Sequence, residues 1–354
     1  MTTGVTGWGI LSAAGVGPQV FADALHGRRG TRHPIDTMYD EVLPEAQAHV
    51  VTDFDIKSHL GRKGTTFYDR GTGLALVATA QALEDSGLRV DDKNRRRVGV
   101  VFGTTAGSLS STMTFSKDTL IQARPYLVNP ALFPNTVMNT AAGQAAIRFQ
   151  LKGVNTTLAG GPVAFLNVLR YAQNTLDRLR ADALLVGAVE EFTPHSAWAG
   201  RHIGITPGEA AGVFVLERAD EARRTGRQVH TELSPVVCRF SPGGPTVDAV
   251  LACADAALDQ AATTWDALSH SLISGTDGPM AAHIRAAMAL RAPRARQLDL
   301  EVTFGDCRAA AGVVQLAASL VVGAAAALMV GWSEDGALAA AVVRGCADVR
   351  GHRG

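Results

Sequence analysis

The stretch "TTLAGGPVAFLNVLRYAQNTLDRLRADALLVGAVE", residues 156–190, has a short β-rich run, a helix and an apolar strand in succession. Sharp strand-to-helix turns of this kind often carry a catalytic nucleophile. Here the turn consists of Gly160, Gly161 and Pro162, and it offers neither a thiol nor a hydroxyl. The segment therefore has the outline of an active site without its reactive group.

Strands and helices alternate on both sides of this segment. Residues 98–107 form a continuous apolar run, which is typical of a strand covered on both faces. After a buried strand within 208–218, the order restarts with strand-like "VVCRF", helical "TVDAVLACADAALDQAA" and then "SLISGTDGPMAAHIRAA". We therefore predict an α/β fold in which two similar halves, residues 1–230 and 231–354, share one core.

One uncharged segment, "GVVQLAASLVVGAAAALMVGW" at residues 312–332, has about the length of a transmembrane helix. Its apolar residues are mostly Ala, Gly and Val, which insert weakly, and Gln315 lies inside it. We therefore expect no membrane span, and predict a core helix over 308–328 followed by a final strand, "ALAAAVV".

Composition narrows the classes of function. Lys plus Arg and Asp plus Glu number 33 each, so no overall basic field favours nucleic acid. The four cysteines, at 238, 253, 307 and 346, show no CxxC spacing. This argues against a zinc site and a disulfide framework, and it fits a reducing cytoplasm. The N-terminus shows no charged leader followed by an apolar run, so we expect no signal peptide, and we expect no metal or cofactor.

The order of motifs resembles that of the β-ketoacyl synthases of fatty-acid and polyketide assembly. The resemblance covers nearly the whole chain and implies a thiolase-like fold with layers α-β-α-β-α. It rests on an ordered series of stretches: "VTGWGILSAAGVG", "YDRGTGLALVATAQALEDSGL", "RRVGVVFGTTAG", "NPALFPNTVMNTAAGQAAI", "LKGVNTTLAGG", "GEAAGVFVLERADEARRTG", "ISGTDGP" and "TFGDCRAAAGVVQ".

The catalytic residues of that family do not carry over. Ungapped alignment from Lys152 to Glu190 places Pro162 at the position of the nucleophilic cysteine. Ser274, before Gly275 and Thr276, and Asp306, after Gly305, stand at the two histidine positions, and Glu301 replaces a lysine. The family's C-terminal glycine-rich loop is represented only by "GWSEDG".

These losses remove each reagent that condensation requires. The reaction needs a thiolate to hold the acyl chain, two imidazoles at the malonyl thioester and backbone donors for the oxyanion. Ser274 or Cys307 as a relocated nucleophile is the alternative, although a neighbouring carboxylate disfavours a thiolate at Cys307. His195 and His202 have no second ligand at suitable spacing, so we interpret them as ordinary polar residues.

Within the family, the chain resembles the chain-length factors of type II polyketide synthases. These subunits lack the nucleophile and form a heterodimer with an active ketosynthase. Aromatic-polyketide members usually carry Gln at the cysteine position, whereas "AGGPVAF" looks closer to highly reducing or polyene-making systems. The resemblance thus implies a non-catalytic cytoplasmic subunit of antibiotic-type biosynthesis.

The resemblance also implies where a growing acyl chain would run. In the family, the segment around "NPALFPNTV" crosses the dimer interface into the partner's acyl pocket. We therefore predict a tunnel lined by Ala106, Leu109, Thr112, Met113, Leu132 and Phe133. The alternative interpretation is that these six residues simply belong to the hydrophobic core.

Two further functions stay open at this point. One is an independent acyltransferase with a rebuilt site, and the other is a scaffold that docks acyl carrier protein without shaping a chain. Carrier proteins are acidic, so Arg95, Arg96 or Arg201 are candidate contacts. By the resemblance we expect the partner ketosynthase to provide the docking face, so that contact with the carrier protein is indirect.

Overall fold

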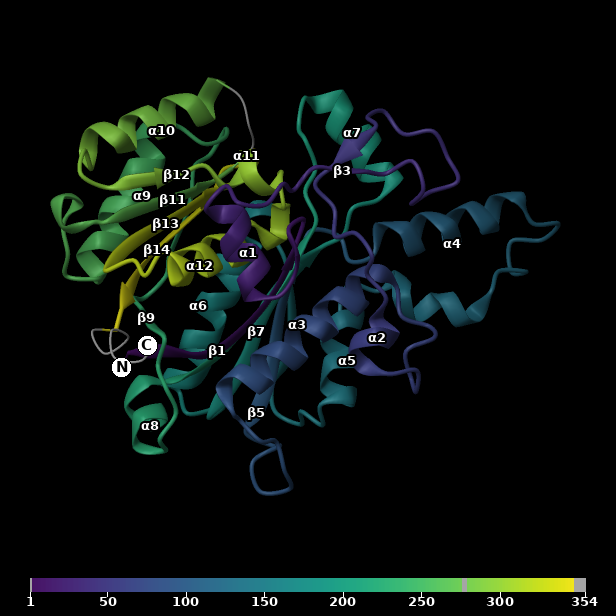
Figure 1. Cartoon of the computed structure of the whole chain (residues 1–354), viewed down its shortest axis with the longest axis horizontal. Coiled ribbons are helices and arrows are strands. Elements are labelled where there is room, and N and C mark those ends of the chain that lie inside the picture. The colour runs from purple at the N-terminus through teal and green to yellow at the C-terminus, as the bar shows by residue number, and fades with distance from the viewer. Residues whose placement is uncertain (1, 276–278, 347–354) are drawn as a thin grey trace.

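The computed structural model describes residues 2–275 and 279–346, and Figure 1 shows its layered α/β arrangement. Its principal strands are β1 (Thr3–Ser12), β5 (Val98–Thr104), β6 (Asn155–Ala159), β7 (Ala183–Glu190), β8 (Ala210–Arg218), β9 (Thr231–Leu233), β10 (Val237–Phe240), β11 (His270–Ser274), β12 (Arg296–Leu298), β13 (Ala326–Trp332) and β14 (Ala337–Gly345). Two-residue strands are β2 (Gly15–Val16), β3 (His33–Pro34) and β4 (Gln47–Ala48).

The α-helices are α1 (Pro18–Leu25), α2 (Ile56–Leu60), α3 (Arg70–Ser86), α4 (Leu109–Ile121), α5 (Thr140–Arg148), α6 (Ala164–Asp177), α7 (Pro194–Ile203), α8 (Ala219–Arg224), α9 (Val247–Gln260), α10 (Pro279–Arg291), α11 (Leu300–Phe304) and α12 (Ala311–Val321). Short 3-10 helices are η1 (Pro130–Thr136), η2 (Gly161–Val163), η3 (Trp265–Ala267) and η4 (Arg308–Ala310).

The two halves repeat one strand pattern. The first runs β6-β5-β7-β8-β1 and the second β12-β11-β13-β14-β10. In each half, two parallel pairings are followed by two antiparallel ones. Strand β9 pairs with both β1 and β14 and joins the halves into one hydrogen-bonded sheet. The predicted duplicated α/β fold is confirmed, whereas the boundary at residue 230 stays a prediction.

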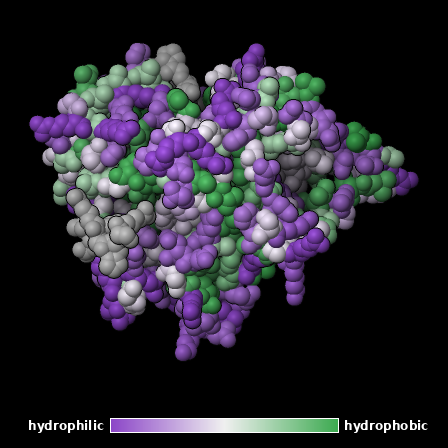
Figure 2. Space-filling view, in the orientation of Figure 1, coloured by the Kyte–Doolittle hydropathy of each residue, from purple (hydrophilic) through white to green (hydrophobic). Residues whose placement is uncertain are grey.

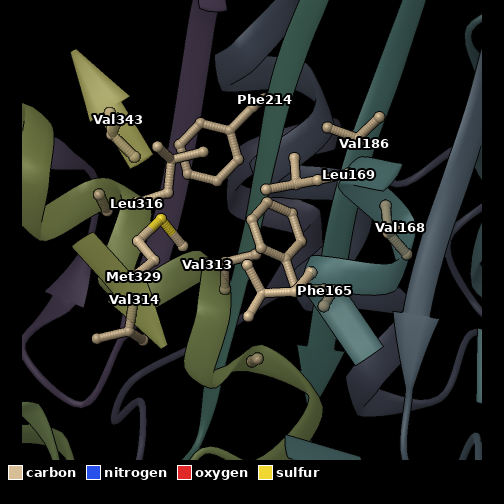
Figure 3. Close-up of a cluster of buried hydrophobic side chains, with 14 of the residues drawn as sticks. Phe165, Val168, Leu169, Val186, Phe214, Val313, Val314, Leu316, Met329 and Val343 are labelled. Carbon is tan, nitrogen blue, oxygen red and sulfur yellow. The ribbon is translucent and has the colours of Figure 1, made fainter. Parts of the chain in front are cut away.

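Helices α6 and α12 form the middle layer (Figure 1). Figure 3 shows their side chains meeting: Phe165 of α6 lies beside Val313 of α12 and Phe214 of β8. The rings of Phe165 and Phe214 are 5.6 Å apart between centroids. A methyl group on Gly312 would stand 2.9 Å from Cβ of Phe165. Small residues in α12 therefore serve close packing inside the protein.

The segment 312–332 is buried, as predicted, but it is not one helix. Helix α12 ends at Val321, Gly323 has a φ of +57°, and residues 326–332 form β13 between β11 and β14. The predicted helix over 308–328 is therefore wrong at its C-terminal end. A continuous apolar run has no periodicity that separates a buried strand from a buried helix. Within residues 2–275 and 279–346, no helix is both long enough and apolar enough to cross a bilayer.

Helix α4 and η1 pack against each other and project from the body of the protein (Figure 1). We call residues 109–136 the arm. It exposes large apolar side chains, and hydrophobic residues are visible on this projection in Figure 2. They are Met113, Leu120, Ile121, Tyr126, Leu127 and Phe133.

Candidate functional site

The strand-to-helix turn at residues 160–162 is buried at Pro162. Strand β6 ends at Ala159, η2 follows and α6 starts at Ala164. Pro162 lies inside η2 and is buried, while Gly161 has a φ of +50°. Proline fits the first turn of a helix because it has no N–H to satisfy there. Pro162, at the position predicted for the nucleophile, thus supports the turn and offers no reactive atom.

Ser274, at the end of β11, lies beside the same turn. A methyl group on Gly331 would be 3.4 Å from Ser274 Oγ and 3.6 Å from the carbonyl oxygen of Pro162. The Gln315 side-chain amide donates to Ser274 Oγ at 3.1 Å. Ser274 itself is 3% exposed, so its hydroxyl is a buried hydrogen-bonding group. The neighbouring Thr276 of the motif lies outside the described residues.

Glu301 stands where the resemblance places the family's lysine, and it holds the turn after β11. Its Oε1 accepts from the backbone N–H of Gly275 at 3.0 Å, and its Oε2 accepts from Arg285 at 2.9 Å. The Glu301 side chain is only 8% exposed. A buried carboxylate needs such partners, because desolvation without them costs several kcal/mol. Glu301 therefore has a structural role that a lysine at this position cannot fill in the same way.

Asp306 is also buried, at 8% exposure, just before η4. Its Oδ1 accepts from the backbone N–H of Arg308 at 2.8 Å, and its own N–H donates to Thr206 O at 2.8 Å. The 3-10 helices η2 and η4 pack against each other, which brings the Pro162 turn next to this segment. The structure thus gathers Pro162, Ser274 and Asp306 in one region, and Glu301 is bonded to the residue that follows Ser274.

The cysteine in this region is unreactive. Cys307 is 2% exposed, and burial first, then the nearby carboxylates of Asp306 and Glu190, raise the pKa of its thiol well above the usual range. A thiolate is the reactive form of cysteine, so this thiol stays protonated at neutral pH. His195 and His202 lie exposed on α7, and the described residues contain no group of three or more metal-binding side chains.

Trp332 fills the space beneath Gly275. It is 1% exposed, and a methyl group on Gly275 would stand 2.0 Å from its Cε2 atom. We expect Gly275→Ala to lower the free energy of unfolding by about 1–3 kcal/mol, because the indole must move in a packed core. Urea unfolding measures this loss. Gly143→Ala is the control, since nothing lies within 4 Å of that added methyl group and helical alanine is favourable. Equal stability of the two variants contradicts the packing argument.

Five of the six predicted tunnel residues lie on α4 or η1 of the arm, and Ala106 lies in the turn before α4. Leu109, Thr112 and Leu132 are half-buried, whereas Ala106, Met113 and Phe133 are exposed in the single chain. The rings of Phe115 and Phe133 are 6.0 Å apart between centroids and join α4 to η1. These six residues form an open surface in this chain alone, so the tunnel stays a prediction that needs a second chain.

A pocket with both polar and apolar lining residues adjoins the arm on its body side. Asp69, Ser108, Thr157 and Glu191 line it together with Met138. None of the six predicted tunnel residues belongs to this lining. Sequence reasoning missed Glu191, although two consecutive glutamates directly after an apolar strand were a visible signal.

Comparisons with known proteins agree with the fold and the motif order. Residues 3–206 match the family described as "Beta-ketoacyl synthase, N-terminal domain", which is more than half of the chain. The chain therefore belongs to the β-ketoacyl synthase family.

Similar sequences include "3-oxoacyl-[acyl-carrier-protein] synthase 2" of Vibrio cholerae, 27% identical over 252 residues, 65% of this chain and 61% of that protein. The same protein of Staphylococcus aureus is 27% identical over 65% of this chain and 60% of its own. The match thus spans less than two thirds of these relatives.

Solved structures extend the similarity to the full chain. "The ishigamide ketosynthase/chain length factor" is 32% identical, with a TM-score of 0.88 and coverage of 98% of this chain and 99% of that one. A type II PKS acyl-carrier protein in complex with its ketosynthase bound to the hexaketide gives 17% identity and a TM-score of 0.81, over 98% and 99%. At that identity the second likeness concerns the fold alone.

Proposed function

We propose that this chain is the non-catalytic chain-length-factor subunit of a type II polyketide synthase. It pairs with an active ketosynthase, and its arm lines the tunnel that receives the growing acyl or polyene chain. One observation carries the proposal: in a ketosynthase fold, the nucleophile and both histidine positions hold Pro162, Ser274 and Asp306, all of them buried. The 32% identity to a ketosynthase/chain length factor structure supports it.

The surface supports pairing with a second chain. Strand β6 pairs with β5 along one edge, and it is the last strand of the sheet among the described residues. An open strand edge is a template for pairing with another chain. The apolar side chains of the arm lie exposed on the same half of the protein, and contiguous apolar surface marks interaction sites.

The other two functions have weaker support. An independent acyltransferase needs an accessible nucleophile, and Ser274 and Cys307 are both buried. A carrier-protein scaffold needs free basic residues, yet Arg95 pairs with Asp92 and Arg201 pairs with Glu45, each at 2.7 Å. Of the three candidate arginines, Arg96 is left as an exposed side chain, and one such residue is a weak basis for docking an acidic protein. Carrier protein therefore enters the proposal through the ketosynthase partner.

Co-expression with an intact type II ketosynthase tests the proposal. We expect a stable complex in which an acyl-thioester probe modifies only the ketosynthase, as read by intact-protein mass spectrometry. The isolated chain is expected to show no acyl adduct and no condensing activity. A stable acyl adduct at Ser274 or Cys307 contradicts the proposal. A soluble, stable monomer that does not bind the ketosynthase contradicts it too.

A further inference from the structure

The turn between β5 and α4, residues 105–108, leads into the arm and is held at both ends by carboxylates. Glu190 is the last residue of β7, and Glu191 follows it. The Thr105 hydroxyl donates to Glu190 Oε2 at 2.6 Å, and the Ser108 hydroxyl donates to Glu191 Oε1 at 2.9 Å. The predicted tunnel residue Ala106 lies within this turn, and Leu109 directly follows it as the first residue of α4.

Glu191 also links two helices to the sheet. Its Oε2 accepts from the backbone N–H of Gly71 in the first turn of α3 at 3.0 Å. Its Oε1 accepts a longer bond, 3.4 Å, from the backbone N–H of Ser110 in the first turn of α4. The residue is 7% exposed, so these bonds are shielded from water. Such charge-assisted bonds are stronger than neutral ones.

We propose that Glu191, assisted by Glu190, is a positioning residue that sets where the arm stands relative to the body. It thereby fixes Leu109 and Met113 beside the acyl chain of the partner. The inference rests on the proposed function. Gly71 and Ser110 lie in the first turns of two different helices, so one carboxylate with four acceptor sites suits the junction better than a neutral side chain.

Both carboxylates titrate near neutrality. Burial raises the pKa of Glu191 to about 7, with Asp69 adding repulsion, while Arg70 and Tyr39 also face this region. Burial likewise raises the pKa of Glu190 to about 7, against the opposing effect of Arg308 and with the repulsion of Asp306. Above about pH 7, Glu190 and Glu191 are ionised and accept strong hydrogen bonds from the turn. Below that pH, the protonated carboxyl groups accept more weakly.

The sign of the pH effect on stability distinguishes a local change at the turn from unfolding of the protein. A raised pKa means that the folded chain binds the proton more tightly than the unfolded chain does. Through these groups, stability is lost as pH rises from the ordinary glutamate value to about 7, so acidification over this range adds stability through them. A change at the turn between pH 8 and pH 6 is therefore local.

The test compares Glu191→Gln with the wild-type chain, each in complex with the ketosynthase. Glutamine keeps the size but presents an NH₂ group to one of the donors. At pH 8 we expect the amides of Gly71 and Ser110 to lose roughly tenfold in hydrogen-exchange protection, corrected for intrinsic rates. We also expect the variant at pH 8 to give the product lengths that the wild type gives at pH 6, with no further change on acidification. Glu84→Gln, an exposed change on α3, is the control.

Wild-type amide protection and wild-type product lengths in Glu191→Gln at both pH values overturn the inference. If the complex forms no extended product with any chain, the proposed function fails instead. Amide protection in the isolated chain then still decides whether Glu191 holds the turn. Changed protection with unchanged product lengths leaves Glu191 a merely structural residue and also overturns the inference.

Discussion

Glu209→Ala is expected to lower the free energy of unfolding by about 3–5 kcal/mol. Glu209 is fully buried and binds Arg70 through both oxygens, at 2.6 and 2.7 Å. It also accepts from the backbone N–H groups of Val51 and Phe192 at 2.8 and 3.2 Å. Removing the carboxylate leaves a largely buried guanidinium and two buried amides without this partner. Urea unfolding followed by circular dichroism measures the loss.

A surface ion pair provides the matched control. Arg201 and Glu45 are 2.7 Å apart, but both side chains are more than half exposed. Glu45→Ala is expected to change the free energy of unfolding by less than about 1 kcal/mol, because water replaces the lost interaction. A loss below about 1 kcal/mol in Glu209→Ala as well contradicts the role given to the buried pair.

The sequence predicted most of the fold because its strands and helices differ in pattern. The apolar run at 98–107 became β5, and the stretch "YDRGTGLALVATAQALEDSGL", with its apolar periodicity before Gly87, forms α3, which stops at a left-handed glycine. Strands β9 and β12, three residues each, went unpredicted because so short a run has no measurable periodicity. Helix α4 also went unpredicted, although Ser108 caps its first turn by accepting from Ser111 N–H.

For the candidate site, sequence order located the altered positions but not their partners. Glu301 was visible as a substituted lysine position, whereas its bond to Arg285 depends on how α10 and α11 meet. Gln315 was noted only as a polar residue in an apolar segment, and its donation to Leu272 O, Val330 O and Ser274 Oγ depends on three elements. Such contacts are set by tertiary packing, which residue spacing does not encode.

These partners make the residues at the predicted catalytic positions part of the packed fold. A catalytic residue keeps its reactive atom accessible, whereas the side-chain oxygens of Ser274 and Glu301 form hydrogen bonds inside the fold. Reversion of one position, such as Pro162→Cys, would therefore leave a thiol without its imidazoles. The proposed division of labour places the chemistry on the ketosynthase and leaves the shape of the tunnel to this chain.

Met113→Trp in the assembled complex is expected to shorten the polyketide by one or more extension units. Met113 and Leu109 are four residues apart on α4 and share one helix face. Met113 is 42% exposed in the single chain, so an indole there fits this fold but takes space from the proposed tunnel. Overpacking of about 1–3 kcal/mol against the longest chain corresponds to a loss of roughly fivefold or more of that product. Chromatography with mass detection gives the length distribution.

Thr114→Trp carries the same bulk one position further, about 100° around the helix, and is expected to leave product length unchanged. Met113→Ala removes bulk from the predicted wall, so its products are expected to keep or exceed the wild-type length. The direction of these three changes separates a tunnel wall from a docking surface. A docking surface predicts lower yield at constant length in both tryptophan variants, because it affects how often a chain is delivered and not where the chain ends. Constant length in Met113→Trp, with the complex intact, therefore removes the arm from the control of chain length.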